Sequence, residues 1–133
     1  MQANWDEQFR NWTTPRAANS ALALFYHNDH NQLSKASHDF LWGLMEQTTT
    51  GPNRIKGLLP TGTAVAHKTG FSGTNEAGIT AAVNDIGVIA LPQGGHFFIS
   101  VFVTNSTENT ETNERIIADV AKVAWDYLAE PGT

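Results

Sequence analysis

The sequence predicts an α/β (α+β) fold, in which helices pack on one face of an antiparallel sheet and a C-terminal helix packs on the other. Three patterns predict it: two segments with helical spacing come first, three segments with strand character follow, and a last segment has helical spacing again. No repeat, low-complexity tract or linker divides the 133 residues, so we expect one domain.

The first part of the chain predicts a helix, a polar break and a second helix. A hydroxyl cap followed by a proline at Thr14-Pro15 is typical of a helix start. The expected inner face of this helix consists of Ala18, Ala21, Leu22 and Phe25. After residues 27–31, a second helix from about Ser34 has its apolar face at Leu33, Phe40, Leu41, Leu44 and Met45. Gly51 and Pro52 oppose its continuation, and the residues before Thr13 show no period and predict a loop.

The middle of the chain predicts a three-stranded antiparallel meander. Residues 63–69 alternate with a period of two, and residues 70–78 form a turn rich in glycine. Residues 79–91 have strand composition, residues 92–95 read as a hairpin turn, and residues 96–104 are a mostly apolar third strand. The first and third strands are the expected edges of the sheet, free to pair with strands that this chain does not contain.

A C-terminal amphipathic helix is expected from about Thr110. Its apolar positions are Ile116, Ile117, Val120, Val123, Ala124, Tyr127 and Leu128. Three tryptophans, Trp12, Trp42 and Trp125, are expected to anchor the core rather than to form a stacking platform.

Composition excludes several classes of function. The formal net charge of −5 argues against a nucleic-acid partner, which requires a basic surface. No apolar run approaches the roughly 20 residues that span a bilayer, so no membrane partner is expected. The first residues lack the basic and apolar regions of a secretory signal. The absence of cysteine excludes disulfides, thiolate zinc sites and a cysteine nucleophile.

The most informative local motif is His67-Lys68-Thr69-Gly70, at the end of a predicted strand. It places an ammonium, a hydroxyl and an open backbone along one edge of a cleft, which suits a substrate that carries a carboxylate and develops an oxyanion. Taken alone, the tripeptide Lys68-Thr69-Gly70 also fits a strand that ends in these residues by chance.

Two other candidate sites are weaker. Ser72 lies in a near miss of the nucleophile-elbow pattern, because the second glycine comes one position early. His27, Asp29 and His30 read better as a solvated loop than as a metal site. We expect His67 to influence its lysine neighbour rather than to act as a base or ligand.

Several segments, in the right order, resemble the class A (active-site serine) β-lactamases, most closely their extended-spectrum PER/VEB-like branch. They are TTTGPNRIKGLLPTGTAVAHKTG at 48–70, NDIG at 84–87, LPQG at 91–94 and TNERIIA at 112–118. The resemblance implies a β-lactamase/transpeptidase-like fold of which this chain is the C-terminal half, starting within the Ω-loop. Residues 1–14 would be an Ω-loop remnant, 15–59 two helices with loops, 62–104 the meander and 110–130 the last helix.

The resemblance also implies roles for individual residues. Lys68 matches the lysine that holds the substrate carboxylate and shapes the field around the nucleophile, and Thr69 matches the hydroxyl that binds that carboxylate. Arg54 resembles the arginine that reaches the carboxylate in this branch, since Ile79 occupies the position where other members carry it. Thr50, Gly70 and Ser72 border the cleft.

Phe71 would supply a backbone N–H to the oxyanion hole, where loss of one donor typically lowers the rate about 10²–10³-fold. Phe71 departs from the usual Ser or Thr at this position, so the backbone donor is kept while a side-chain hydrogen bond is lost.

The residues that would complete a serine hydrolase are absent from the sequence. No Ser-x-x-Lys or Ser-Asp-Asn motif occurs, and Glu7 lies too far along the chain to replace the Ω-loop glutamate. We therefore expect the chain alone to be inactive. The parent protein would be a periplasmic or secreted hydrolase that cleaves penicillins and cephalosporins and confers antibiotic resistance, without a metal or organic cofactor.

The implied partners are a β-lactam and the missing N-terminal half of the enzyme. Two alternatives stay open. One is a fragment of a penicillin-binding transpeptidase, which shares Lys-Thr-Gly. The other is a non-catalytic binding or self-associating module, a homo-oligomer whose free sheet edges pair with a second copy.

Overall fold

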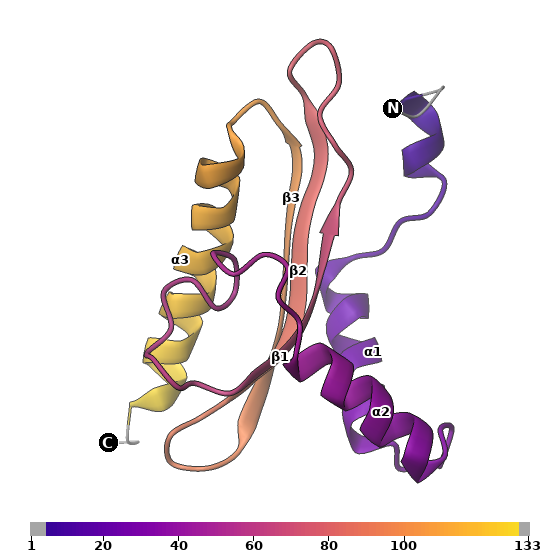
Figure 1. Cartoon of the computed structure of the whole chain (residues 1–133), viewed down its shortest axis with the longest axis vertical. Coiled ribbons are helices and arrows are strands. Elements are labelled where there is room, and N and C mark those ends of the chain that lie inside the picture. Colours follow the sequence, from indigo (N-terminus) through magenta and orange to yellow (C-terminus); the bar gives the residue numbers. More distant parts are fainter. Residues whose placement is uncertain (1–4, 131–133) are drawn as a thin grey trace.

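An antiparallel sheet with the strand order β1-β2-β3 forms the centre of the computed structural model, which describes residues 5–130 (Figure 1). The elements, in chain order, are η1 (Trp5–Phe9), α1 (Pro15–His27), α2 (Lys35–Glu46), β1 (Val65–Phe71), β2 (Thr80–Ala90), β3 (His96–Ser106) and α3 (Thr110–Ala129). The predicted meander between two early helices and one late helix is therefore confirmed.

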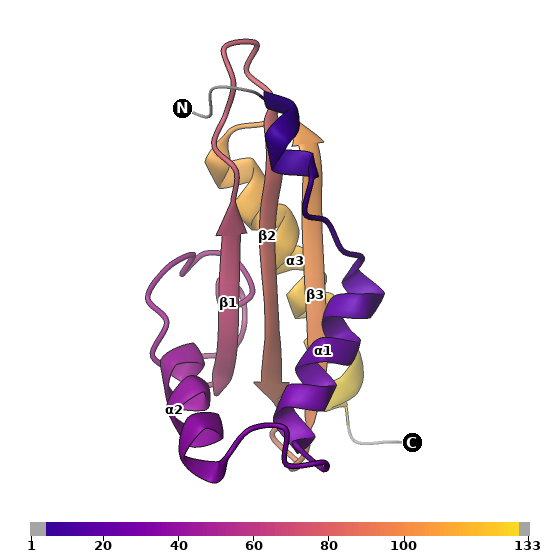
Figure 2. The same cartoon turned by 90° about the vertical axis from the view of Figure 1, so that its right-hand side faces the viewer.

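The helices cover both faces of the sheet. Helices α1 and α2 lie on one face, and α3 lies on the other together with the segment that joins α2 to β1 (Figures 1 and 2). Strands β1 and β3 are the two edges, as the sequence predicts. No helix among residues 5–130 is both long enough and apolar enough to cross a membrane.

The core lies between the sheet and α3. In strand β2 the side chains alternate between the two faces, so that Val83, Asp85 and Ile89 are all buried toward α3. The buried cluster on this side consists of Ile55, Val65, Val83, Ile89, Ile99, Ile117 and Ala121. The α3 face of the sheet is therefore the better covered of the two.

Side-chain caps define the start of each α-helix. Thr14 accepts a hydrogen bond from the Ala17 N–H at 3.2 Å, and Ser34 accepts one from the Ser37 N–H at 3.2 Å. Asn109 accepts one from the Thr112 N–H at 2.8 Å. These caps satisfy backbone donors that lack a partner within the helix, and they confirm the predicted helix starts.

The N-terminal segment differs from expectation. Residues Trp5–Phe9 form a 3-10 helix where the sequence predicts a loop, and the predicted Ω-loop residues 1–4 lie outside the described residues. The expectation that Trp12 anchors the core is wrong, because its side chain is 82% exposed. Trp12 lies in the link from η1 to α1, which crosses the surface of the sheet, whereas Trp42 stacks on Phe25.

The apolar face of α2 is only partly covered. Phe40 is 66% exposed, and Leu41 and Leu44 are exposed as well. The helix contacts the sheet mainly at the edge strand β1, so part of the stripe read from the sequence extends beyond the sheet. Exposed clusters of this kind mark surfaces that another segment or protein can cover.

We predict that Ile117→Ala lowers the free energy of unfolding by about 2–5 kcal/mol, because it opens a cavity in the core beneath α3. Val123→Ala on the same helix is the control: its side chain is 69% exposed, and its effect is expected to stay within about 0.5 kcal/mol. Urea denaturation measures both. Equal effects of the two substitutions would contradict this assignment of the core.

Candidate functional site

The free edge of β1 turns backbone groups away from the sheet. Ser72 N–H donates to the Ala82 carbonyl at 3.0 Å, and antiparallel pairing alternates from there along the strand. Gly70 and Lys68 therefore face β2, whereas the N–H and C=O groups of Thr69 and Phe71 point outward from the sheet. The outward direction of the Phe71 N–H is the one an oxyanion donor requires.

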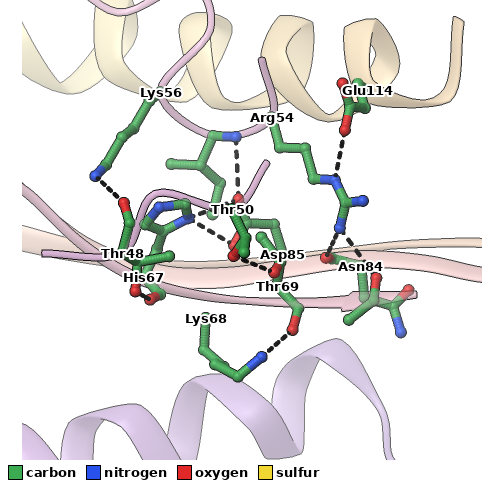
Figure 3. A network of polar contacts seen from close by, with 12 residues as sticks. Thr48, Thr50, Arg54, Lys56, His67, Lys68, Thr69, Asn84, Asp85 and Glu114 are labelled. Atoms are coloured by element: carbon green, nitrogen blue, oxygen red, sulfur yellow. Dashed lines mark hydrogen bonds and ion pairs between the residues drawn. The ribbon is translucent and has the colours of Figure 1, made fainter. Parts of the chain in front are cut away.

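Two hydroxyls meet beside this edge. Thr50 Oγ1 lies 2.8 Å from Thr69 Oγ1 (Figure 3). Gly51 makes the approach possible: its φ is +58°, and a Cβ there would lie 2.7 Å from Thr69 Cγ2 and 2.9 Å from Arg54 Cδ. The side chains of Thr69 and Arg54 thus both lie against Gly51, next to the hydroxyl of Thr50.

Arg54 is buried and held by three hydrogen bonds. Its Nε donates to Glu114 Oε1 at 3.1 Å, and its Nη1 donates to the carbonyls of Gly70 and Asn84, each at 3.0 Å. Among the described residues, Nη2 makes no hydrogen bond. The guanidinium is therefore fixed in place, and one of its nitrogens stays available to an anion.

Lys68 lies on the opposite face of β1 from Thr69 and Arg54, because neighbouring side chains of a strand alternate. Its ammonium donates to the Thr69 carbonyl (Figure 3). Lys68 also borders an apolar groove of roughly 500 Å³ between α1 and α2. The groove is lined by Ala21, Leu22, Phe25, Leu41, Leu44, Met45, Thr48 and Ile86. Strand β1 thus lies between the side chain of Lys68 and the hydroxyls of Thr50 and Thr69.

Phe71, the last residue of β1, and Ser72, which follows it, have different side-chain environments. Phe71 is 56% exposed, so its ring is accessible beside the outward N–H. Ser72 Oγ donates to the Gly73 carbonyl at 2.9 Å and accepts from the Ala82 N–H at 2.9 Å. Both partners are backbone groups, and an activated nucleophile would require a base instead.

His67 forms a buried pair that the sequence does not reveal. Its Nδ1 lies 2.9 Å from Asp85 Oδ2, and both side chains are fully buried. The Ile55 N–H also donates to Asp85 Oδ2, at 3.2 Å.

Neither Asp85 nor Glu114 was identified as a site residue from the sequence. Glu114 reads there as one of several acidic residues near a helix start. The signal for Asp85 is its place on a buried strand, where a charged residue requires a partner.

No group of three or more potential metal ligands occurs among residues 5–130. His27 instead packs near His96 and Phe98, with ring centroids 6.2 and 6.1 Å away.

The fold matches that of β-lactamases. The pattern of the β-lactamase enzyme family covers residues 1–128, and the chain therefore belongs to that family, within class A. It is 55% identical to β-lactamase VEB-1 of Pseudomonas aeruginosa over 127 residues, which are 96% of this chain and 42% of that protein. It is 50% identical to the extended-spectrum β-lactamase PER-1 of the same species, covering 40% of it.

Solved structures agree with this assignment. The crystal structure of TLA-1 extended-spectrum β-lactamase superimposes with a TM-score of 0.93 at 55% identity, covering 98% of this chain and 46% of that one. A β-lactamase of Chitinophaga pinensis superimposes with a TM-score of 0.88 at 43% identity, covering 96% and 46%. The predicted β-lactamase-like fold is confirmed, and the chain spans less than half the length of these relatives.

We predict that Glu114→Ala lowers the free energy of unfolding by about 3–5 kcal/mol, because it leaves the buried Arg54 guanidinium without its charge partner. Glu111→Ala, one turn earlier on α3 and exposed, is expected to cost less than about 1 kcal/mol. Urea denaturation of both variants measures the difference. A Glu114 variant as stable as the Glu111 variant would contradict the role of this ion pair.

Proposed function

We propose that this chain forms the carboxylate-binding and oxyanion-binding edge of a class A serine β-lactamase that hydrolyses the amide bond of penicillins and cephalosporins. One observation carries the proposal: Thr50 Oγ1 lies 2.8 Å from Thr69 Oγ1, and the side chains of Thr69 and Arg54 both lie against Gly51, beside the strand whose end carries the outward N–H of Phe71. The 55% identity to VEB-1 supports it.

The hydroxyls of Thr50 and Thr69 donate to the substrate carboxylate, and Arg54 Nη2 supplies the positive charge beside them. Hydrogen bonds to an ionised group are stronger than neutral ones, so this cluster orients the β-lactam ring along β1. The ring carbonyl then lies near Phe71, whose N–H stabilises the oxyanion of the tetrahedral intermediate. The exposed Phe71 ring forms an apolar wall next to that carbonyl.

The nucleophilic serine, its proton relay and the water-activating glutamate come from a segment corresponding to the remainder of the relatives. That segment packs in the groove between α1 and α2, where the Lys68 ammonium acts on the field around the serine. The exposed apolar residues Phe40, Leu41 and Leu44 favour such a partner. The reaction proceeds through a serine acyl-enzyme and needs no cofactor. It takes place in the periplasm or after secretion, and it confers antibiotic resistance.

The first test is hydrolysis of a chromogenic cephalosporin by the purified chain, with and without a separately produced N-terminal half of a VEB-like enzyme. We expect no turnover by the chain alone and turnover by the mixture. Serine-dependent hydrolysis by the pure chain would refute the assignment of the nucleophile to the other segment. An inactive mixture that nonetheless forms the complex would refute the proposed activity.

A substitution tests the carboxylate site itself. In the active mixture, Thr69→Val keeps the shape of the side chain but removes the hydroxyl, and we expect KM to rise about tenfold or more with little change in kcat. Thr107→Val, in the exposed link between β3 and α3, is the control and is expected to leave both constants unchanged. Equal KM values for the two variants would exclude Thr69 from carboxylate binding.

A second candidate function is a self-associating module, favoured by the free edges of β1 and β3. A second copy would add a strand to one of these edges and cover part of the exposed apolar surface. Light scattering over a range of concentrations decides it: a mass that rises to that of a dimer favours this function. A strict monomer at high concentration excludes it.

A further inference from the structure

The buried carboxylate of Asp85 connects two parts of the proposed site. It lies on β2, fully buried, and accepts hydrogen bonds from two groups that are far apart in the sequence. One donor is the Ile55 N–H, at 3.2 Å, and the other is His67 Nδ1, at 2.9 Å (Figure 3). A buried charge is stable only when its oxygens are hydrogen-bonded, so this carboxylate holds both donors at fixed positions.

Each of these donors is the direct neighbour of a residue in the site. Ile55 follows Arg54, whose guanidinium bonds to the Gly70 and Asn84 carbonyls. His67 precedes Lys68 and Thr69 on β1. Asp85 is paired with Thr69 across the β1–β2 register, so its side chain lies directly behind the carboxylate-binding hydroxyl.

The packing around His67 leaves its ring little freedom. Gly87 is paired with His67 across the two strands, and a Cβ on Gly87 would lie 2.9 Å from His67 Cβ. His67 Nε2 is buried and has no hydrogen-bond partner among the described residues. A proton on Nε2 would therefore be an unsatisfied buried donor, whereas a proton on Nδ1 faces Asp85.

We propose that Asp85 is a positioning residue, which through the Ile55 amide and His67 sets the separation between Arg54 and the Lys68–Thr69 strand. This inference rests on the proposed function of that edge. Asp85 touches neither substrate nor reacting atoms. It keeps the segment 50–55 against β1, so that Thr50, Thr69 and Arg54 meet the same carboxylate.

The first test is the tautomer of His67 in the isolated chain, measured by long-range ¹⁵N–¹H NMR. We expect the proton on Nδ1. In Asp85→Leu, which removes both carboxylate oxygens, the preference of the proton for Nδ1 is expected to be lost. A wild-type ring with its proton on Nε2, or a tautomer that does not respond to Asp85→Leu, would overturn the proposed pair.

The second test asks whether Asp85 positions Arg54. In Asp85→Asn, we expect the Ile55 amide and the Arg54 Nε–H to exchange with solvent at least about tenfold faster, because the bond to a charged acceptor is lost. Ser100→Ala is the matched control, since it removes only a hydrogen bond to Asn19 between β3 and α1. Wild-type exchange rates in Asp85→Asn would overturn the inference.

Two substitutions of His67 separate its hydrogen bond from its volume. His67→Asn keeps a donor near the position of Nδ1 and is expected to preserve the slow exchange of Arg54 Nε–H within about threefold. His67→Leu fills the space without a donor and is expected to lose this protection. Equal exchange in the two variants would show that packing alone holds the segment, against the proposal.

Turnover by the reconstituted mixture tests whether Asp85 positions the carboxylate site or only stabilises the fold. Asp85→Asn is expected to raise KM for the cephalosporin about tenfold while kcat stays within about threefold, and Ser100→Ala is expected to change neither. A loss confined to kcat would overturn the positioning role. A wild-type mixture without turnover would instead refute the proposed function, and the exchange rates of the chain alone would still decide whether Asp85 positions Arg54.

Discussion

The central strand β2 imposes the constraint on which the rest of the structure depends. It pairs with β1 on one side and β3 on the other, and its side chains alternate between two different environments. Val83, Asp85 and Ile89 face the core beneath α3, whereas Ile86 faces the groove between α1 and α2. A shift of one residue in this register would bring Asp85 out of the core and bury the wrong set of side chains.

Arg54 connects three separate parts of the chain through one planar group. Its guanidinium bonds to Glu114 of α3, to the Gly70 carbonyl of β1 and to the Asn84 carbonyl of β2. The buried charge of Arg54 is tolerated because the fold holds these three acceptors in the positions that its hydrogen bonds require. The same contacts give the site its rigidity, since a guanidinium held on two nitrogens presents the third in a single direction.

The sequence was sufficient for most of the fold, because local signals and periodicity agree there. The Thr14 and Ser34 caps define where α1 and α2 begin, and the period-two pattern of residues 63–69 identifies β1. Sequence reasoning failed for Trp12, which a hydrophobic scale assigns to the interior and the structure leaves exposed. The spacing of apolar residues does not show whether another element packs on a given side chain. None of the described elements covers Trp12.

The sequence by itself determined the family and the motif Lys68-Thr69-Gly70, because these follow from residue identity. The outward direction of the Phe71 N–H came from the β1–β2 register. Only the tertiary structure decided which side chains meet. The contacts of Arg54 with Glu114 and of His67 with Asp85 join residues 60 and 18 positions apart. Such contacts depend on how helices and strands pack on each other, and no local pattern encodes that packing.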